Sequence, residues 1–135
     1  MRTIKFRGYI PPYLTMKGRW VYGLLVHYNV ETATIVNNEE LYVAPSNTIG
    51  QFTGLYDKNG MEIYEGDIVH LYYYRQNDLG ETLWFHRNVL VKWSDDDTFY
   101  GIGGWDGDDY FDIATRYRHS IQEVIGNIHD KEELK

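Results

Sequence analysis

The sequence predicts a mainly β fold, with an SH3-like small barrel in the C-terminal part and an N-terminal β subdomain packed on it. Asn59-Gly60 lies between two short apolar runs, which is a strong hairpin signal because both residues tolerate positive φ. Glu65-Gly66-Asp67 marks a second turn, and a β-branched and aromatic run at 68–74 follows it. A turn, a strand, a Gly-Asp turn and another strand in this order are typical of small SH3-like barrels.

The first part of the chain predicts four short strands, near residues 3–9, 19–28, 32–37 and 40–44. In the first of them, alternation places Ile4 and Phe6 inward and Lys5 and Arg7 outward. In the second, one face carries Trp20, Tyr22, Leu24, Val26 and Tyr28. Proline and two small polar residues at 45–47 stop the fourth strand. We therefore expect two domains, an N-terminal strand subdomain at 1–45 and the barrel domain with a short C-terminal tail at 46–135.

The second part of the chain predicts further strands near 51–56, 61–64, 67–75, 82–94, 97–103 and 122–129, with turns at 76–80 and 94–96. Two short helices are candidates, at 111–118 and in the tail from Asp130. The glycine-rich stretch 101–104 predicts a bulged or closely packed strand.

The turns that organise the barrel are assigned to four structural residues: Asn59, Gly60, Gly66 and Asp67. Gly60 is expected in the left-handed region. Glu65 and Asp67 are a pair of carboxylates, but in a Gly-Asp turn we expect them to accept hydrogen bonds from backbone amides rather than to perform acid–base chemistry.

Three stretches also carry a family resemblance. The longest runs from Thr48-Ile49-Gly50-Gln51-Phe52-Thr53-Gly54-Leu55 through Asp57-Lys58-Asn59-Gly60 to Ile63-Tyr64-Glu65-Gly66-Asp67-Ile68-Val69. With Ile4-Lys5-Phe6-Arg7 near the start and Glu123-Val124-Ile125-Gly126-Asn127-Ile128-His129 near the end, it resembles the YopX-like family encoded by phages and prophages. The resemblance implies a mostly β fold with a C-terminal SH3-like barrel and self-association, and it implies no activity. The region 72–105 matches no pattern of the family.

Composition is that of a folded domain without disulfides. Thirteen Tyr, five Phe and four Trp among 135 residues, of which 43% are hydrophobic, argue against disorder. The absence of cysteine excludes disulfides and thiolate zinc sites. The longest uncharged apolar stretch, 20–30, is far shorter than the about 20 residues of a membrane helix. With no secretion signal near its start, the protein is expected in the cytoplasm of a bacterial host cell, without membrane association.

Acidic residues predominate, with a net charge of −7. Seven aspartates, at 95, 96, 97, 106, 108, 109 and 112, have no basic residue among them. A calcium loop requires D-x-D-x-D-G with a late Glu, whereas Asp106-Gly107-Asp108-Asp109-Tyr110 has Gly second and Tyr fifth. We therefore expect solvated hairpin loops that hold no metal. A DNA-mimic surface would need carboxylates spread over one face, and the sequence of these loops does not require such an arrangement.

One stretch interleaves aromatic and basic residues and is the candidate ligand or interface surface. Its members are Tyr72, Tyr74, Arg75, Trp84, His86, Arg87, Lys92 and Trp93. Such residues can hold single-stranded nucleic acid, with rings under the bases and cations along the backbone. The alternative is that some of these aromatic residues are in the core while the cations keep sheet edges soluble. The negative net charge opposes binding to a polyanion.

Catalytic patterns are absent from the sequence. The five histidines include no pair at metal-binding spacing, the three serines lack a Gly-x-Ser-x-Gly elbow, and stretch 101–104 is not a dinucleotide fingerprint. No enzyme activity and no cofactor are expected. We expect a non-catalytic binding or assembly module of phage or prophage origin that forms homo-oligomers or binds an unknown protein partner. The alternative is a nucleic-acid-binding accessory protein that uses the aromatic and basic strands.

Overall fold

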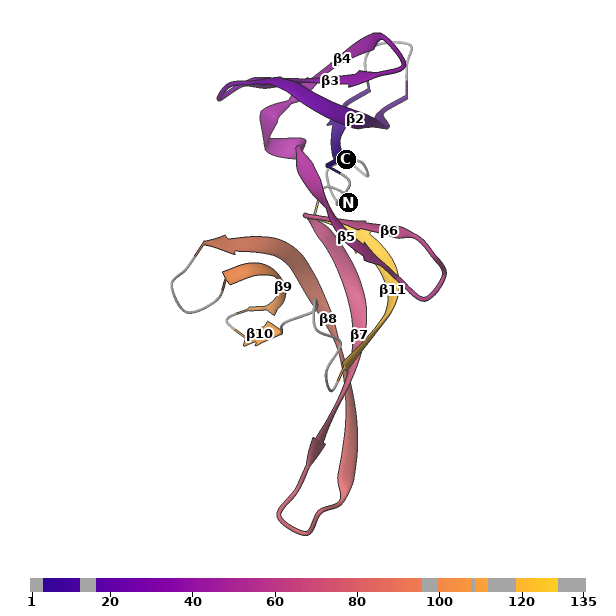
Figure 1. Ribbon diagram of the computed structural model, residues 1–135, viewed down its shortest axis with the longest axis vertical. Coiled ribbons are helices and arrows are strands. Elements are labelled where there is room, and N and C mark those ends of the chain that lie inside the picture. The colour runs from indigo at the N-terminus through magenta and orange to yellow at the C-terminus, as the bar shows by residue number, and fades with distance from the viewer. Residues whose placement is uncertain (1–3, 13–16, 96–99, 108, 112–118, 129–135) are drawn as a thin grey trace. The chain divides into compact units, whose positions relative to one another are not determined.

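The computed structural model describes residues 4–12, 17–95, 100–107, 109–111 and 119–128, and these residues are mainly strand. The strands are β1 (Phe6–Ile10), β2 (Arg19–Tyr28), β3 (Thr32–Asn37), β4 (Glu40–Pro45), β5 (Gly50–Tyr56), β6 (Glu62–Tyr64), β7 (Asp67–Gln76), β8 (Thr82–Asp95), β9 (Tyr100–Asp106), β10 (Asp109–Phe111) and β11 (His119–Asn127). A 3-10 turn, η1 (Ser46–Thr48), joins β4 to β5 (Figure 1). The described residues contain no α-helix. The predicted mainly β fold is confirmed.

The chain divides into two compact units, one formed by residues up to Gly54 and the other by Leu55–Ile128. In the first unit the strand order is β4-β3-β2-β1-β5, and neighbouring strands are antiparallel. Asn38 and Glu39, with φ of 49° and 69°, form the two-residue turn between β3 and β4. Positive φ at both positions is what a type I′ hairpin requires, because its twist matches that of the strands.

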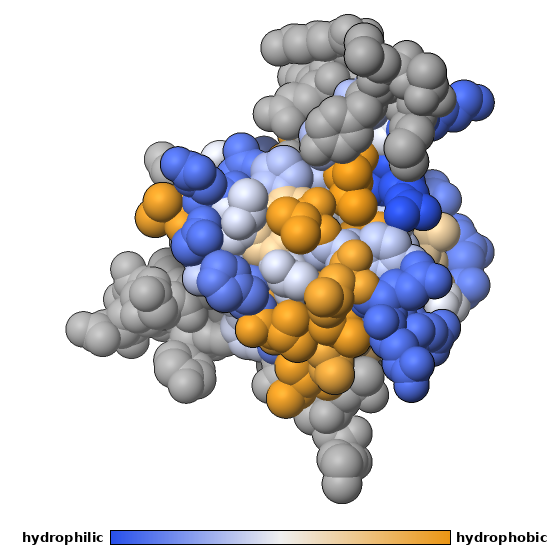
Figure 2. Space-filling view, turned by 90° about the horizontal axis from the view of Figure 1, so that it is seen from above, coloured by the Kyte–Doolittle hydropathy of each residue, from blue (hydrophilic) through white to orange (hydrophobic). Residues whose placement is uncertain are grey.

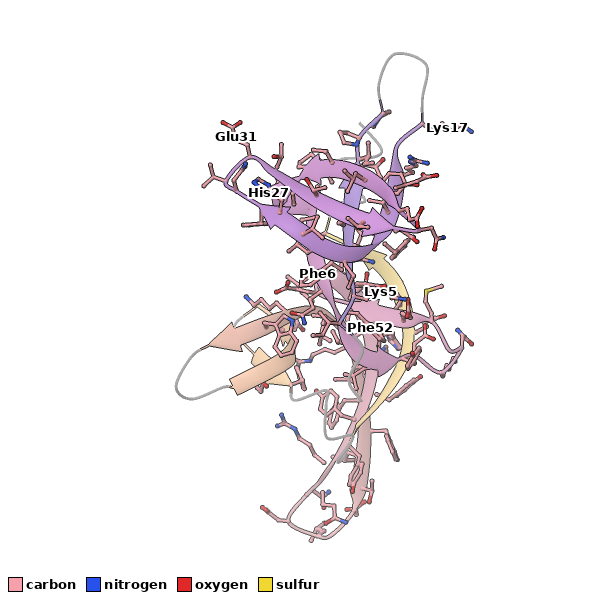
Figure 3. The ribbon with its side chains drawn as sticks, turned by 45° about the horizontal axis from the view of Figure 1, so that its top comes forward. Lys5, Phe6, Lys17, His27, Glu31 and Phe52 are labelled. Carbon is pink, nitrogen blue, oxygen red and sulfur yellow. The ribbon has the colours of Figure 1, made fainter. Side chains whose placement is uncertain are left out.

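The inward and outward assignments for the first predicted strand, 3–9, are wrong at two positions, one just before β1 and one within it. Ile4 is 61% exposed, whereas Arg7 is only 6% exposed. The Arg7 guanidinium lies 4.3 Å from the centroid of the Trp20 ring, on the neighbouring β2. An arginine can bury its stem and place its planar head on an aromatic face, so alternation of charged and apolar residues does not settle which side is inward. Lys5 lies 5.6 Å from the ring centroid of Phe52 (Figure 3).

Segment 45–48 is held by two hydroxyl groups. β4 ends at Pro45, as predicted. Ser46 Oγ donates to the Val30 carbonyl at 2.8 Å, and Thr48 Oγ1 accepts from the Tyr9 amide at 2.9 Å. Both side chains are buried, so the segment is an ordered connection rather than a solvated linker.

The second unit contains a five-stranded antiparallel sheet with the order β10-β9-β8-β7-β11. Its buried core consists of Ile63, Val69, Leu71, Val89 and Val91, and Leu55, Trp93, Phe111 and Val124 pack against it. In β7 the structure buries Val69, Leu71 and Tyr73 on one face and leaves the opposite face half-buried or exposed.

The SH3-like barrel is not confirmed, because neither sheet closes in the described part of the chain. β10 and β11 lie at opposite edges of the second sheet and do not pair with each other. Phe111 ends strand β10 rather than starting a helix, and the other residues of both predicted helices lie outside the described ranges. The closely packed glycine strand is confirmed, since a Cβ at Gly103 would lie 2.1 Å from Tyr110 Cε2.

The predicted turn residues have the expected geometry. Gly60 and Gly66 have φ of 81° and 95°. The Asn59 amide donates to Asp57 Oδ1 at 2.8 Å. The carboxylates also act as expected: Asp67 Oδ2 accepts from the Tyr64 amide at 2.8 Å, and Glu65 Oε2 accepts from the Trp93 amide at 3.3 Å.

Replacing Gly60 with valine should lower the free energy of unfolding by about 1–2 kcal/mol, since a β-branched residue is poorly tolerated in the left-handed region. A Cβ at Gly60 would meet nothing within 4 Å, so backbone strain alone would produce the loss. Urea unfolding measures it, with Lys58→Val at an exposed position of the same turn as the control. Equal midpoints for the two variants would contradict the expected strain at Gly60.

Candidate interaction surfaces

One face of the β7–β8 hairpin carries five ring side chains and one asparagine. We call it the histidine–aromatic face, and it consists of His70, Tyr72 and Tyr74 on β7 with Trp84, His86 and Asn88 on β8. The register pairs His70 with Asn88, Tyr72 with His86, and Tyr74 with Trp84, so paired side chains point to the same side. Ring centroids are 5.2 Å apart for Tyr74 and Trp84 and 5.6 Å apart for Tyr72 and His86. Trp84 is 62% exposed.

Both histidines of this face contact each other. Their ring centroids are 5.1 Å apart with an interplanar angle of 50°, and Tyr72 lies 5.4 Å from His70. His70 Nδ1 lies 2.8 Å from Asn88 Oδ1. His86 and Asn88 are exposed, and His70 is half-buried, so the cluster opens to solvent.

The opposite face of the hairpin carries the arginines. Tyr73 stacks on Phe85 with centroids 5.5 Å apart, and the guanidinium groups of Arg75 and Arg87 lie 5.7 and 6.0 Å from the Tyr73 ring. Arg87 Nη1 also forms an ion pair with Asp106 Oδ2 at 3.4 Å. Strand alternation therefore separates these cations from Tyr72, Tyr74, Trp84 and His86.

The last two predicted surface residues lie elsewhere on β8. Lys92 Nζ is 4.9 Å from the ring centroid of Trp105, which belongs to the paired strand β9. Trp93 is partly buried and packs against the core of the second unit. The structure thus brings together four of the eight predicted surface residues. Of the other four, Arg75 and Arg87 lie on the opposite face, Lys92 lies on β8 against a ring of β9, and Trp93 packs against the core.

Among the described residues, the second sheet narrows to two strands beyond Tyr73. In the described residues, β11 pairs with β7 as far as Tyr73, and β9 pairs with β8 from Leu90 onward. The rest of the hairpin continues as a ribbon past β9 and β11 (Figure 1). Large apolar side chains of the ribbon are exposed, including Leu79 at 83% and Phe85 at 41%.

A second candidate surface lies on the first unit. We call it the apolar sheet face, and it consists of Leu24 and Val26 on β2, Val36 on β3, and Leu41 and Val43 on β4. The register aligns Leu24, Val36 and Leu41 in one row across three strands. Leu24, Val26, Leu41 and Val43 are between 56% and 68% exposed. Figure 2 is seen from above, which is the side where Figure 1 draws β2–β4, and it shows hydrophobic side chains grouped on the surface.

The predicted common face of β2 is confirmed for Leu24, which pairs with Val36, but it is wrong at Tyr28, which pairs with Ala33 on the opposite face of β3. The exposure of the face was not predicted. For the part of the face on the fourth strand, the available sequence signal was alternation, since Leu41 and Val43 lie two residues apart. A bulge in β2 between Leu25 and His27 places Val26 out of register. Bulges of this kind follow from local pairing, which alternation alone does not show.

No metal or membrane feature is found where the structure describes the chain. The described residues contain no group of three or more His, Cys, Asp or Glu side chains arranged to hold a metal ion. Four of the seven acidic-loop aspartates, at 96, 97, 108 and 112, lie outside the described ranges. Within the described ranges, no helix has the length and hydropathy needed to cross a membrane.

A family model described as YopX protein matches residues 17–134, which is most of the chain. No curated protein and no solved structure matches it.

Proposed function

The chain belongs to the YopX protein family, and from this premise we propose that it is a non-catalytic assembly module that binds a second copy of itself through the apolar sheet face. The observation that carries the proposal is the exposure of that face. Leu24 and Leu41 lie in one row with Val36, and they are 57% and 68% exposed. Exposed apolar side chains that form one patch are typical of interaction sites, whereas scattered ones are not.

A second copy is the partner that the charges favour. The five side chains of the apolar sheet face are uncharged, and Thr34, which pairs with Val43, is uncharged too. A chain with a net charge of −7 repels a copy of itself, so contact is least costly where no carboxylate is brought close to another. β4 is also the edge strand of the sheet, which offers backbone groups for symmetric pairing.

The setting of this assembly is a further part of the proposal. We propose phage or prophage origin and action in the cytoplasm of the bacterial host, both of which rest on the family resemblance. A foreign protein partner would compete for the same face.

Nucleic-acid binding is the weaker alternative. The histidine–aromatic face offers exposed rings, but Arg75 and Arg87 lie on the other side of the hairpin, and Arg87 is paired with Asp106. Among the described residues, the two arginines nearest these rings in sequence therefore point away from them, whereas single-strand binding normally uses rings and cations together. Binding of a single-stranded oligonucleotide that weakens steeply with salt would favour this alternative over the assembly module.

Light scattering after size exclusion tests the assembly. The wild-type chain should show a mass above its monomer mass of 16.0 kDa at micromolar concentration. Leu24→Asp and Leu41→Asp should each raise the dissociation constant at least about tenfold. In each variant the new carboxylate would be buried against apolar side chains and brought close to the same carboxylate of the second copy.

The matched control is Leu79→Asp, the same substitution at a leucine that is 83% exposed on the β7–β8 turn. It should leave the association unchanged. A wild-type chain that remains monomeric over a hundredfold range of concentration would overturn the proposal. Loss of association in Leu79→Asp alone would also overturn it, because the interface would then lie on the ribbon.

A further inference from the structure

We propose that His70 and His86 form a two-ligand site for a divalent transition-metal ion of the Zn²⁺ type. The two residues lie on paired strands of one hairpin, diagonal to each other on the histidine–aromatic face. Imidazole nitrogen is a ligand that Zn²⁺, Cu²⁺ and Ni²⁺ accept, while Mg²⁺ and Ca²⁺ require oxygen ligands. Nothing in the assembly proposal requires this site.

The spacing of the rings fits one shared ion. In a tetrahedral site with Zn–N bonds of about 2.05 Å, each ring centroid lies about 3.2 Å from the metal, so two centroids are roughly 5.2 Å apart. The observed centroid separation of His70 and His86 is 5.1 Å. Cross-strand pairing by β7 and β8 sets this separation, so little rearrangement of the backbone is needed.

Asn88 prepares His70 to act as a ligand. A carboxamide oxygen can only accept a hydrogen bond, so the 2.8 Å contact makes His70 Nδ1 the donor to Asn88 Oδ1. The proton then resides on Nδ1, and Nε2 keeps the lone pair that a metal ion needs. Metal-bound histidines characteristically donate their second ring nitrogen in this way, which also fixes the ring orientation.

The surroundings leave room for the remaining coordination positions. His86 is exposed, and Tyr72 packs against both imidazole rings with centroids 5.4 and 5.6 Å away. The described residues provide no third histidine, cysteine or carboxylate to the group. Water would therefore complete the coordination, and affinity in the micromolar range rather than that of a structural zinc site is expected.

Isothermal titration of the untagged full chain with ZnCl₂ tests the site. We expect saturable binding of one ion at this site, with affinity at least about tenfold lower in His70→Gln and in His86→Gln. His27→Gln is the matched control, because His27 is an exposed histidine near the β2–β3 turn of the first unit (Figure 3), and it should leave the affinity unchanged. MgCl₂ and CaCl₂ should give no saturable heat.

Asn88 is a positioning residue and has a separate test. Asn88→Asp preserves an acceptor and adds charge, so it should bind Zn²⁺ at least as tightly as the wild type, whereas Asn88→Leu should weaken binding by about tenfold. Histidine ring resonances should shift for His70 and His86 on addition of Zn²⁺. The absence of saturable binding, or binding that persists in the His70→Gln, His86→Gln double variant, would overturn the site.

Discussion

Replacing Asp57 with alanine should lower the free energy of unfolding by about 4 kcal/mol, because the buried carboxylate is hydrogen-bonded to three backbone amides. Oδ1 accepts from the amides of Asn59 and Met61 at 2.8 and 2.9 Å, and Oδ2 accepts from the Val124 amide at 3.0 Å. Asp57 is 7% exposed, so water cannot satisfy the three amides without opening the structure. Urea unfolding measures the change.

Stability should also depend on pH through this group. Burial alone would raise the pKa of Asp57, but the three backbone hydrogen bonds and the charge of Lys58 outweigh it and lower the pKa below the usual value of 3.8. The folded state then holds the proton less tightly than the unfolded state. The contribution of Asp57 is therefore complete above about pH 5 and is lost as the pH falls through and below 3.8.

The matched variant for both effects is Asp57→Asn. It keeps an acceptor for the two turn amides but presents an NH₂ group to the Val124 amide, so its loss should be smaller than that of alanine. It should also lack the part of the acid dependence that Asp57 causes. An alanine variant that unfolds within about 1 kcal/mol of the wild type would show that the carboxylate does not stabilise the turn and β11 as described.

Replacing Gly23 with alanine should lower the free energy of unfolding by about 3 kcal/mol, because there is no space for even one added methyl group. An ideal Cβ at Gly23 would lie 2.2 Å from the Val36 carbonyl oxygen and 3.1 Å from Ile35 Cγ2. The first of these atoms is backbone on the paired strand, so the clash can be relieved only by moving β3 away from β2. Thermal unfolding followed by circular dichroism measures the loss.

Gly54→Ala separates this steric effect from backbone strain. Gly54 has a φ of 84°, and a Cβ there would meet nothing within 4 Å. Gly54→Ala should lower the free energy of unfolding by about 1 kcal/mol, because only the backbone conformation disfavours alanine at this position. Equal melting temperatures for the two alanine variants would show that β2 and β3 can separate enough at this point to admit a methyl group.

The ends of strands were predictable where turn-forming residues separate one strand from the next. Strands β2 and β3 begin and end at the predicted residues, because Asn29–Glu31 and Asn38–Glu39 interrupt two strongly β-forming runs. The positive φ values of Gly60 and Gly66 were predictable for the same reason. These features depend on residues that are neighbours in sequence.

Closure and exposure were not predictable from the same patterns. A barrel requires its first and last strands to meet, and such pairing between distant segments leaves no periodic signal in either strand. Alternation places Tyr72 and Tyr74 on one side of β7, but whether that side is covered depends on what else packs there. The charge of Arg7 predicted an outward side chain, whereas the structure buries this side chain against the Trp20 ring.

The ribbon formed by the ends of β7 and β8 has a consequence for local opening. An isolated two-stranded hairpin is marginally stable in water, so its end can fray without unfolding the rest of the sheet. Backbone amides near Asn77–Gly80 should therefore exchange their hydrogens with solvent far sooner than those of Val69 or Val89, which are fully buried. This gradient makes the turn at 77–80 the natural position at which to insert a foreign peptide into the chain, because its ends already lie together and little of the core depends on it.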